Sequence, residues 1–508
     1  MADEFLTLAR DQNQARGLAE YGLRFLHGEL GRPDEQVLAR LERFHLDSIA
    51  CGVSALAAGA NAPSVLRHEA LEYRLPANAT GACCLGSQVP VMPEKAALAN
   101  SSAVREWDAN GTNFGYNPQR GHTRGEFGHN DYYPVAIAAA QVARLDGRMA
   151  LRAMLVLDEI RGRLAEVFAL KDHKIDHVVY GGIGSAVVYG ALLGATVDQI
   201  ESALGLLVAH YIPFRAIRAG KQLSDSKGAS AAITTEMAVS SVRRAMRGFV
   251  GPADIFRNPE AIFCLFEKPA QPGTSPFDLD LATGGSDFAV MGMHFKLGLY
   301  EHQSAGAIQG LMDLLHQYPK LLDDESALRH VRIAIYQPAL GIIGDPAKRD
   351  PRTRQSADHS MVYIIATLLR KALESHTAGW RELMLVPADY DAQALVHPLT
   401  RRLMEKIEFV HGGPEYDARY PDGIPTSLEI EHATLGKLAS GLVMYPEGHA
   451  RNTSGHLDAL LEHKFRLLAS MGVDDVDALR DRFSNLGRKT AAEIKGLYDF
   501  RIRGLADA

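Results

Sequence analysis

The chain has 508 residues, which is too long for one simple hydrophobic core, so we expect two or more domains. Hydrophobic residues make up 46% of the sequence and charged residues 23%, which is ordinary for a globular protein and excludes a largely disordered chain. The formal net charge is −7 and there is no long run of Lys or Arg, so we expect no nucleic-acid partner. An anionic ligand would need a local cationic pocket.

The cysteines predict a reducing compartment. Cys51, Cys83, Cys84 and Cys264 show no CxxC spacing and are too few for a disulfide framework in a chain of this size. The first residues, MADEFLTLARDQNQ, lack a basic region followed by an apolar run, so neither a signal peptide nor a transit peptide is predicted. We therefore expect a cytoplasmic protein.

The first half of the chain predicts helices. Residues 13–58 place apolar side chains three and four apart on both sides of a turn at 31–33, which indicates a helical hairpin. Residues 70–91 are rich in Pro, Asn and Gly and predict a short strand or an irregular crossover. From residue 93 to 250 we expect helices, interrupted by polar segments rich in His, Lys and Arg.

One helical segment needs a membrane check. Residues 178–197 carry no charge over about the length that spans a bilayer. The segment contains many Gly and Ala residues, and its flanks are polar on both sides. It therefore predicts a close-packed helix inside a helical domain, and we expect no membrane partner.

The second half changes in composition. Residues 269–285 contain several Pro and Gly and read as a linker. Beyond them, segments with strand character (VRIAIYQPA, TSLEIEHA, KLASGLVMYP) alternate with helical ones (LMDLLHQY, YIIATLLRKAL, PLTRRLMEKI). The chain is helical again after residue 445. We predict a mainly α fold, in which a large helical domain is built from residues 1–284 and 445–508 and an α+β domain from residues 285–444 is inserted.

The segment from Arg105 to Pro134 is the strongest candidate for a functional site. It places many ionisable side chains in a Gly-rich loop between two apolar helices, where acid, base and anion-binding groups are commonly found. A solvated surface loop is the alternative, but the density of His, Arg and carboxylate residues favours function.

Several familiar chemistries have no motif here. The sequence lacks G-x-x-x-x-G-K-[ST], G-x-S-x-G and HExxH, and Gly181-Gly182-Ile183-Gly184 lacks the spacing of a dinucleotide fingerprint. His122, His129 and Asp131 are a weak metal pattern, because seven residues in a Gly-rich loop separate the two histidines. We expect neither a metal nor a cofactor.

The remaining ionisable residues suit proton abstraction beside a carboxylate, because clustered cations and hydrogen-bond donors stabilise the aci-carboxylate that forms. Elimination, decarboxylation and epimerisation all remain open. The set is Asp108, His122, His129, His173, His177, Arg215, Lys221, Lys227 and His302.

A helix predicted after Ser224, Asp225 and Ser226 adds to this set. These residues are good N-caps, and the helix N-terminus together with Lys221 and Lys227 would favour a bound carboxylate or phosphate.

The chain resembles the MmgE/PrpD superfamily, which includes 2-methylcitrate dehydratase and cis-aconitate decarboxylase. Trp107-Asp108, Thr112 and Gly128-His129 look like the WxDxxDT-type loop and the GHPSDN-type segment of that family. IDHVVYGGIGSA and SDSKGASAAITTE resemble the segments that supply a histidine and a lysine, here His177 and Lys227. MHFKLGLYEHQSAGAI resembles the lid stretch, with Lys296 and His302. DPAKRDPRTRQSADHSMVYIIA and YPEGHARN are similar to segments of the dehydratase branch.

The resemblance implies a helical domain with a smaller α+β lid, an active site in the cleft between them, a homodimer and no metal. It implies a cofactor-independent lyase for a small di- or tricarboxylate, most simply a hydro-lyase of the 2-methylcitrate dehydratase type. The alternatives are a cis-aconitate decarboxylase-like or an iminodisuccinate epimerase-like enzyme, or a non-catalytic dimeric carboxylate-binding protein.

Our hypothesis assigns roles to these residues. His129, His177 or Lys227 would transfer protons, and Asp108 and Thr112 would orient these groups by hydrogen bonds. Arg215, Lys221 and His302 would bind carboxylates. Tyr336, His449 and Arg451 complete the predicted substrate-binding set.

The sequence departs from the family in the loop. His129 is followed by Asn130-Asp131-Tyr132-Tyr133 in place of Pro-Ser-Asp-Asn, a run from Gly115 to Phe127 looks inserted, and Leu299 stands near the family's lid proline. We expect the altered loop to line the substrate cavity and to set a substrate preference of its own.

Overall fold

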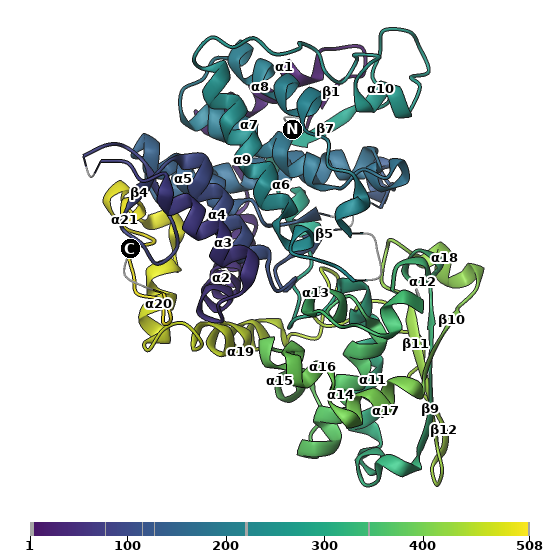
Figure 1. The fold of residues 1–508 in the computed structure, drawn as a ribbon. Coiled ribbons are helices and arrows are strands. Elements are labelled where there is room, and N and C mark those ends of the chain that lie inside the picture. The colour runs from purple at the N-terminus through teal and green to yellow at the C-terminus, as the bar shows by residue number, and fades with distance from the viewer. Residues whose placement is uncertain are drawn as a thin grey trace.

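The computed structural model describes residues 5–76, 78–113, 115–125, 128–218, 222–343 and 346–505. The chain is mainly helical, as predicted, with small sheets (Figure 1). The helices of the first half are α1 (Gln14–Leu26), α2 (Glu35–Ala57), α3 (Asn61–Glu72), α4 (Pro93–Arg105), α5 (Tyr133–Ala143), α6 (Gly147–Val167), α7 (Val178–Leu192), α8 (Val197–His210), α9 (Ser226–Ala245) and α10 (Ile262–Phe266).

Helix α7 lies at the centre of the first group. Every residue of α7 is buried, and the helix packs against α1, α5, α6, α8 and α9. Its glycines permit this close packing: a Cβ on Gly181 would lie 1.9 Å from Cζ of Tyr132, and one on Gly182 would lie 2.6 Å from Cγ2 of Thr234. The prediction of a buried, close-packed helix is confirmed. In the described part of the chain no single helix is long and apolar enough to cross a membrane; α2 and α3 meet that test only as a pair bent by 89°.

The second group of elements contains a four-stranded sheet in the order β10-β9-β11-β12. Strands β9 and β10 are parallel, whereas β11 is antiparallel to both β9 and β12. Helix α11 packs on β11, and α14 contacts β10 and α17. The strands are β9 (Leu328–Ile335), β10 (Ile407–His411), β11 (Thr426–His432) and β12 (Gly436–Ala439), and the helices are α11 (Ala305–Gln317), α12 (Gln337–Ile343), α13 (Arg354–Ala357), α14 (Met361–Ser375), α15 (Trp380–Leu383), α16 (Ala392–Leu395), α17 (Pro398–Glu405) and α18 (Pro414–Arg419).

The C-terminal helices return to the first group. Helices α19 (Leu457–Ala469) and α20 (Val476–Phe483) contact α2, and α21 (Ala491–Lys495) contacts α5. In Figure 1 the yellow C-terminal segment accordingly lies beside the purple α2 rather than beside the green sheet. The domain boundaries at 284 and 445, and the movement of the second group as a lid, stay predictions.

One prediction about local structure needs correction, and one strand was missed. Residues 269–285 are more than a linker, because β7 (Leu279–Ala282) pairs antiparallel with β1 (Phe5–Leu8), and β8 (Gly284–Gly285) pairs with β2 (Arg32–Pro33). Strand β10 was not predicted, because its sequence IEFVH follows the α17 helix without a turn residue. The crossover at 70–91 contains a small hairpin of β3 (Ala82–Cys83) and β4 (Pro90–Val91).

Candidate active site

The loop between α4 and α5 forms one wall of a pocket with about 620 Å³ of empty space. Two short strands of this loop, β5 (Thr112–Asn113) and β6 (Gly128–His129), pair antiparallel and place Thr112 opposite His129. Asp108 adopts a left-handed backbone conformation with φ of +51°, an uncommon geometry for a non-glycine residue that often marks functional sites. The lining residues are Arg105, Asp108, Thr112, His129, His177, Arg215, Arg218, Lys296, Glu301, His302, Lys348 and His359.

Asp108 is the centre of a buried charge network. Its carboxylate accepts a 2.5 Å hydrogen bond from Nη1 of Arg105 and pairs with Nζ of Lys296, which also donates to the Asp108 carbonyl at 2.8 Å. Nζ of Lys227 lies 3.6 Å from Oδ2. Burial alone would raise the pKa of Asp108, but Arg105, Lys296 and Lys227 hold it well below its usual value. The carboxylate is therefore ionised at neutral pH.

The loop carrying Asp108 is fixed from the far end of the chain. Lys464 in α19 is fully buried and donates to the carbonyls of Ala109 at 2.5 Å and Lys296 at 2.9 Å. It also pairs with Asp47 of α2 at 2.7 Å. One lysine thus ties together the loop, the segment bearing Lys296 and the helical hairpin.

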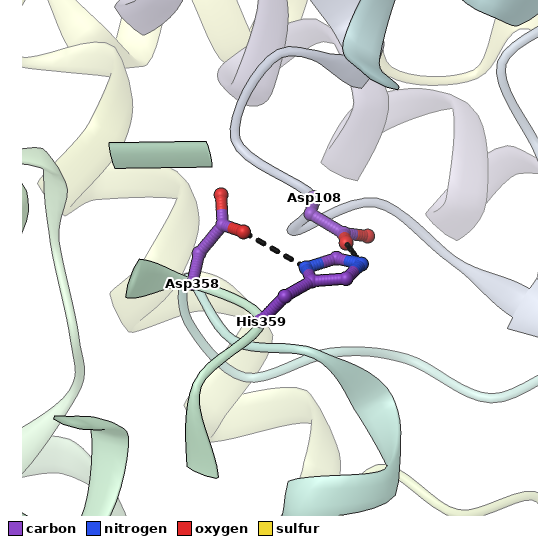
Figure 2. Close-up of side chains that lie close together, drawn as sticks. All are labelled: Asp108, Asp358 and His359. Carbon is purple, nitrogen blue, oxygen red and sulfur yellow. Dashed lines mark hydrogen bonds and ion pairs between the residues drawn. The ribbon is translucent and has the colours of Figure 1, made fainter. Parts of the chain in front are cut away.

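Asp358 and His359 follow α13 and reach the same centre from the second half of the chain (Figure 2). Nδ1 of His359 lies 2.8 Å from Oδ1 of Asp358, and its Nε2 lies 3.3 Å from Oδ2 of Asp108. Burial and the nearby Lys227 lower the pKa of His359 to about 3, although Asp108 and Asp358 oppose this shift.

Asp108, Asp358 and His359 also offer three possible metal ligands within 4.8 Å of one another. Their charge is already balanced, however, since Lys227 pairs with Asp358, Arg354 lies 2.9 Å from Asp358, and Lys296 and Arg105 pair with Asp108. A divalent cation here would meet strong repulsion from these cations. The expected absence of a metal stays a prediction.

His177 faces the pocket from the N-terminus of α7. Its Nδ1 lies 2.9 Å from Oδ1 of Asp176, and the side chain is 6% exposed. Burial lowers the pKa of His177, although Asp176 opposes this effect, so the imidazole is neutral at neutral pH. His129 approaches His177 edge-on, with ring centroids 5.4 Å apart, and burial together with Arg105 and Lys296 lowers its pKa well below the usual value.

Glu301 and His302 line the side of the pocket formed by the second half. Burial raises the pKa of Glu301 to about 7, although Lys296 opposes the shift. His302 is 3% exposed and its ring stacks on His294 at 5.1 Å. Thr112 donates through its hydroxyl to the carbonyl of Gly128 at 3.0 Å.

Lys227 is buried behind the lining of the pocket. It lies in the first turn of α9, and its Nζ pairs with Asp358. The anion site expected at this helix N-terminus stays a prediction. Burial lowers its pKa to about 8. The predicted side-chain cap is not formed, because Asp225 accepts hydrogen bonds from Asn61 at 2.6 Å and Gln355 at 3.0 Å.

The predicted substrate-binding residues divide between several places. Arg215 lines the pocket from a short 3-10 helix, Arg215–Arg218, while Lys221 lies outside the described residues. Tyr336 is fully buried beyond the end of β9, where it stacks on Tyr420 at 4.4 Å, and it is not among the described residues that line the pocket.

His449 and Arg451 line a second, neighbouring pocket of about 570 Å³. His294 also lines this second pocket, and its ring lies 4.0 Å from that of His449 and 5.1 Å from that of His302, which lines the first pocket. Arg451 pairs with Asp422, and its guanidinium lies 5.6 Å from the ring of Tyr116.

The inserted-looking run does not line the first pocket in its described part, residues 115–125. Gly115 and Tyr116 line the second pocket. Farther along the run, two arginines form ion pairs with other segments of the first half: Arg120 pairs with Asp280 at 2.8 Å and Arg124 with Glu267 at 2.7 Å. Residues 115–125 therefore do not line the cavity around Asp108, and our expectation that the altered loop lines the substrate cavity stays a prediction. Phe114, Glu126 and Phe127 lie outside the described residues.

Sequence reasoning missed several lining residues. Arg105 was noted only as part of the loop, and Lys296 only as part of a motif, whereas Arg218, Glu301, Lys348 and His359 were not selected. The adjacent pairs Asp176-His177 and Asp358-His359 were an available signal, because a carboxylate beside a histidine often fixes its tautomer. His122 and His173 lie elsewhere, near Glu166 at 3.5 Å and Glu267 at 3.3 Å.

Two family models match successive parts of the chain. Residues 26–274 match the model of the MmgE/PrpD N-terminal domain, and residues 300–486 match that of the MmgE/PrpD C-terminal domain. The chain is similar to the 2-methylcitrate dehydratase of Salmonella typhi, with 25% identity over 76% of this chain and 77% of that protein. It is also similar to the 2-methylcitrate dehydratases of Escherichia coli (strain K12), with 23% identity over 75% of this chain and 76% of that protein, and of Cupriavidus necator, with 26% identity over 76% and 77%. The chain belongs to the MmgE/PrpD family.

Proposed function

We propose that the protein is a cofactor-independent lyase that removes a proton beside a carboxylate of a small di- or tricarboxylate, as a hydro-lyase of the 2-methylcitrate dehydratase type. Family membership and the names of the relatives support the reaction class. The homodimer, the cytoplasmic location, the moving lid formed by residues 285–444 and the absence of a cofactor are parts of the same proposal.

One observation carries the proposal: a neutral histidine, backed by a carboxylate, faces a pocket lined by several cations. His177 hydrogen-bonds Asp176 at 2.9 Å, and Arg105, Arg215, Arg218, Lys296 and Lys348 line the same pocket. A neutral imidazole can take a proton, and the cations stabilise both the bound carboxylate and the extra negative charge that develops on it.

The proposed reaction is an elimination. Nε2 of His177 takes the proton from the carbon beside a substrate carboxylate, and the C–H electron pair moves onto that carboxylate to give the aci-carboxylate. The pair then forms the C=C bond as the hydroxyl leaves the neighbouring carbon. Glu301 protonates the hydroxyl, so that water is released, and His177 and Glu301 return to their starting protonation states by exchange with solvent.

The other predicted residues have supporting roles in this proposal. Arg215, Lys221 and His302 bind substrate carboxylates, and Thr112 and His129 orient the reacting end. Asp108 holds Arg105 and Lys296 in place, and Lys227 fixes Asp358 behind it.

The reaction is tested by incubating the purified protein with 2-methylcitrate, citrate, cis-aconitate and iminodisuccinate in deuterated water and following each by proton NMR. We expect dehydration of a hydroxy-tricarboxylate, with deuterium exchange at the carbon beside the carboxylate. Loss of carbon dioxide would instead identify a decarboxylase, and exchange with inversion an epimerase. If no compound reacts or exchanges, the proposed substrate class is wrong.

The raised pKa of Glu301 predicts how kcat changes at alkaline pH. Because its pKa is about 7, the protonated acid is lost as the pH rises through that value, so kcat is expected to fall about tenfold per pH unit above it. Glu301→Gln should lower kcat and abolish this alkaline limb. Glu29→Gln, an exposed change, is the control. A Glu301→Gln enzyme that keeps the limb would assign the acid to another group.

A further inference from the structure

We propose that Asp176 and Arg218 are positioning residues that hold His177 as a base with its hydrogen on Nδ1 and its lone pair on Nε2. The inference rests on the function proposed above, because it assumes that His177 removes the substrate proton. It adds two residues that do not act on the substrate themselves but determine which nitrogen of His177 can react.

Asp176 fixes the tautomer of His177. Asp176 is fully buried, and its backbone N–H donates to the carbonyl of Pro213 at 2.8 Å, which holds the residue in place. Its Oδ1 lies 2.9 Å from Nδ1 of His177. An ionised carboxylate can only accept, so Nδ1 must carry the hydrogen, and in a neutral imidazole Nε2 is then the proton acceptor.

Arg218 keeps Asp176 ionised. Nε of Arg218 lies 2.5 Å from Oδ2 and Nη2 lies 3.2 Å from Oδ1, so the guanidinium engages both carboxylate oxygens. Burial would raise the pKa of Asp176, but Arg218 and His177 hold it well below the usual value. Without Arg218 a buried carboxylate beside His177 would draw a proton onto the ring and block its function as a base.

Arg218 also links the base to the carboxylate-binding side of the pocket. Its Nη1 donates to the carbonyl of Lys227 at 3.3 Å, and it lies in the same short 3-10 helix as Arg215. The backbone N–H of Arg215 is in turn held by the carbonyl of Lys174 at 2.8 Å, just before Asp176. The arrangement therefore sets the positions of the base and of a carboxylate-binding arginine together.

Asp176→Asn is the direct test. The shorter contact of Arg218 is to Oδ2, so the amide oxygen of the new residue is expected at that position. Its NH₂ then faces Nδ1 of His177 in place of an acceptor, which moves the imidazole hydrogen to Nε2. We expect ¹⁵N NMR of the imidazole to show this inversion and kcat to fall on the order of 10³-fold, with KM changed little. Asp172→Asn, an exposed change in the same segment, should alter neither.

The outcomes separate the inference from the function on which it rests. An unchanged tautomer in the Asp176→Asn protein would overturn the assignment to Asp176, whatever happens to turnover. An inverted tautomer with normal turnover and normal deuterium exchange would instead overturn His177 as the base, and with it this part of the proposed function.

Arg218→Ala provides a second measurement that leaves Asp176 in place. The groups that act on His177 are Asp176, Arg218, Arg215 and the neighbouring ring of His129. Removing one cation raises the pKa of His177, so the acidic limb of kcat/KM should move to higher pH by about one unit, measured below the melting temperature of the variant. A limb that does not move would contradict the role given to Arg218.

Discussion

Replacing His177 by Asn is expected to lower kcat by about 10²- to 10⁴-fold, the usual contribution of a general base. The amide NH₂ of Asn can still donate to Asp176, so the contact at 2.9 Å is largely retained while the Nε2 lone pair is lost. KM should change little, because the lining cations remain. The measurement is steady-state kinetics together with deuterium exchange on the best substrate from the NMR panel.

The matched control is His173→Asn in the same segment. His173 stacks on Phe266 at 5.0 Å and lies 3.3 Å from Glu267, away from the lining of the pocket, so this change should leave kcat within about twofold of the native value. If both variants retain full exchange, the proton is removed by another group, and His129 is the next candidate because its ring contacts that of His177.

Replacing Asp108 by Asn is expected to reduce the free energy of unfolding by about 3–5 kcal/mol, the usual cost of removing one partner from a buried ion pair. The variant leaves Lys296 buried without its paired carboxylate, and Arg105 keeps only Asp131, at 3.4 Å. Lys227 loses the second carboxylate near it. Urea unfolding followed by circular dichroism measures the loss. Asp146→Asn, which replaces one good N-cap residue of α6 by another, should be nearly neutral.

The stability difference between the native protein and the Asp108→Asn variant should become smaller at acidic pH. The pKa of Asp108 is lower in the folded state than in the unfolded chain, so its contribution is fully present above the unfolded value of about 3.9 and is lost as the pH falls through the folded value. The stability gap between the native protein and the Asp108→Asn variant should therefore be constant from about pH 5 to 7 and shrink only below about pH 4. A gap that shrinks near neutrality would indicate that another group carries the effect.

Much of the fold follows from apolar periodicity. Helices α1 and α2 and the buried α7 were predicted because their apolar residues recur at helical spacing or fill a whole segment. The pairing of β1 with β7 was not predictable in this way, since it joins residues more than 270 positions apart and depends on tertiary packing. Strand β10 was missed for a local reason, because it follows a helix directly.

The candidate site was only partly predictable. The structure brings Asp108, Thr112, His129, His177, Arg215 and His302 to one pocket, but their roles stay predictions. Lys227 and Tyr336 are close to the site but buried behind it, which depends on side-chain packing and cannot be read from spacing. Glu301 was missed because a lone glutamate gives no sign of its burial, and burial is what raises its pKa.

Lys464 determines when the site can be assembled during protein synthesis. It bonds the backbone beside Asp108 and beside Lys296, yet it is made 355 residues after Ala109. A ribosome has therefore translated most of the chain before Lys464 can bind the loop, and Asp47 meets this partner only when α19 emerges. Completion of the candidate site is thus a late event in biosynthesis, because it depends on the arrival of the C-terminal helices.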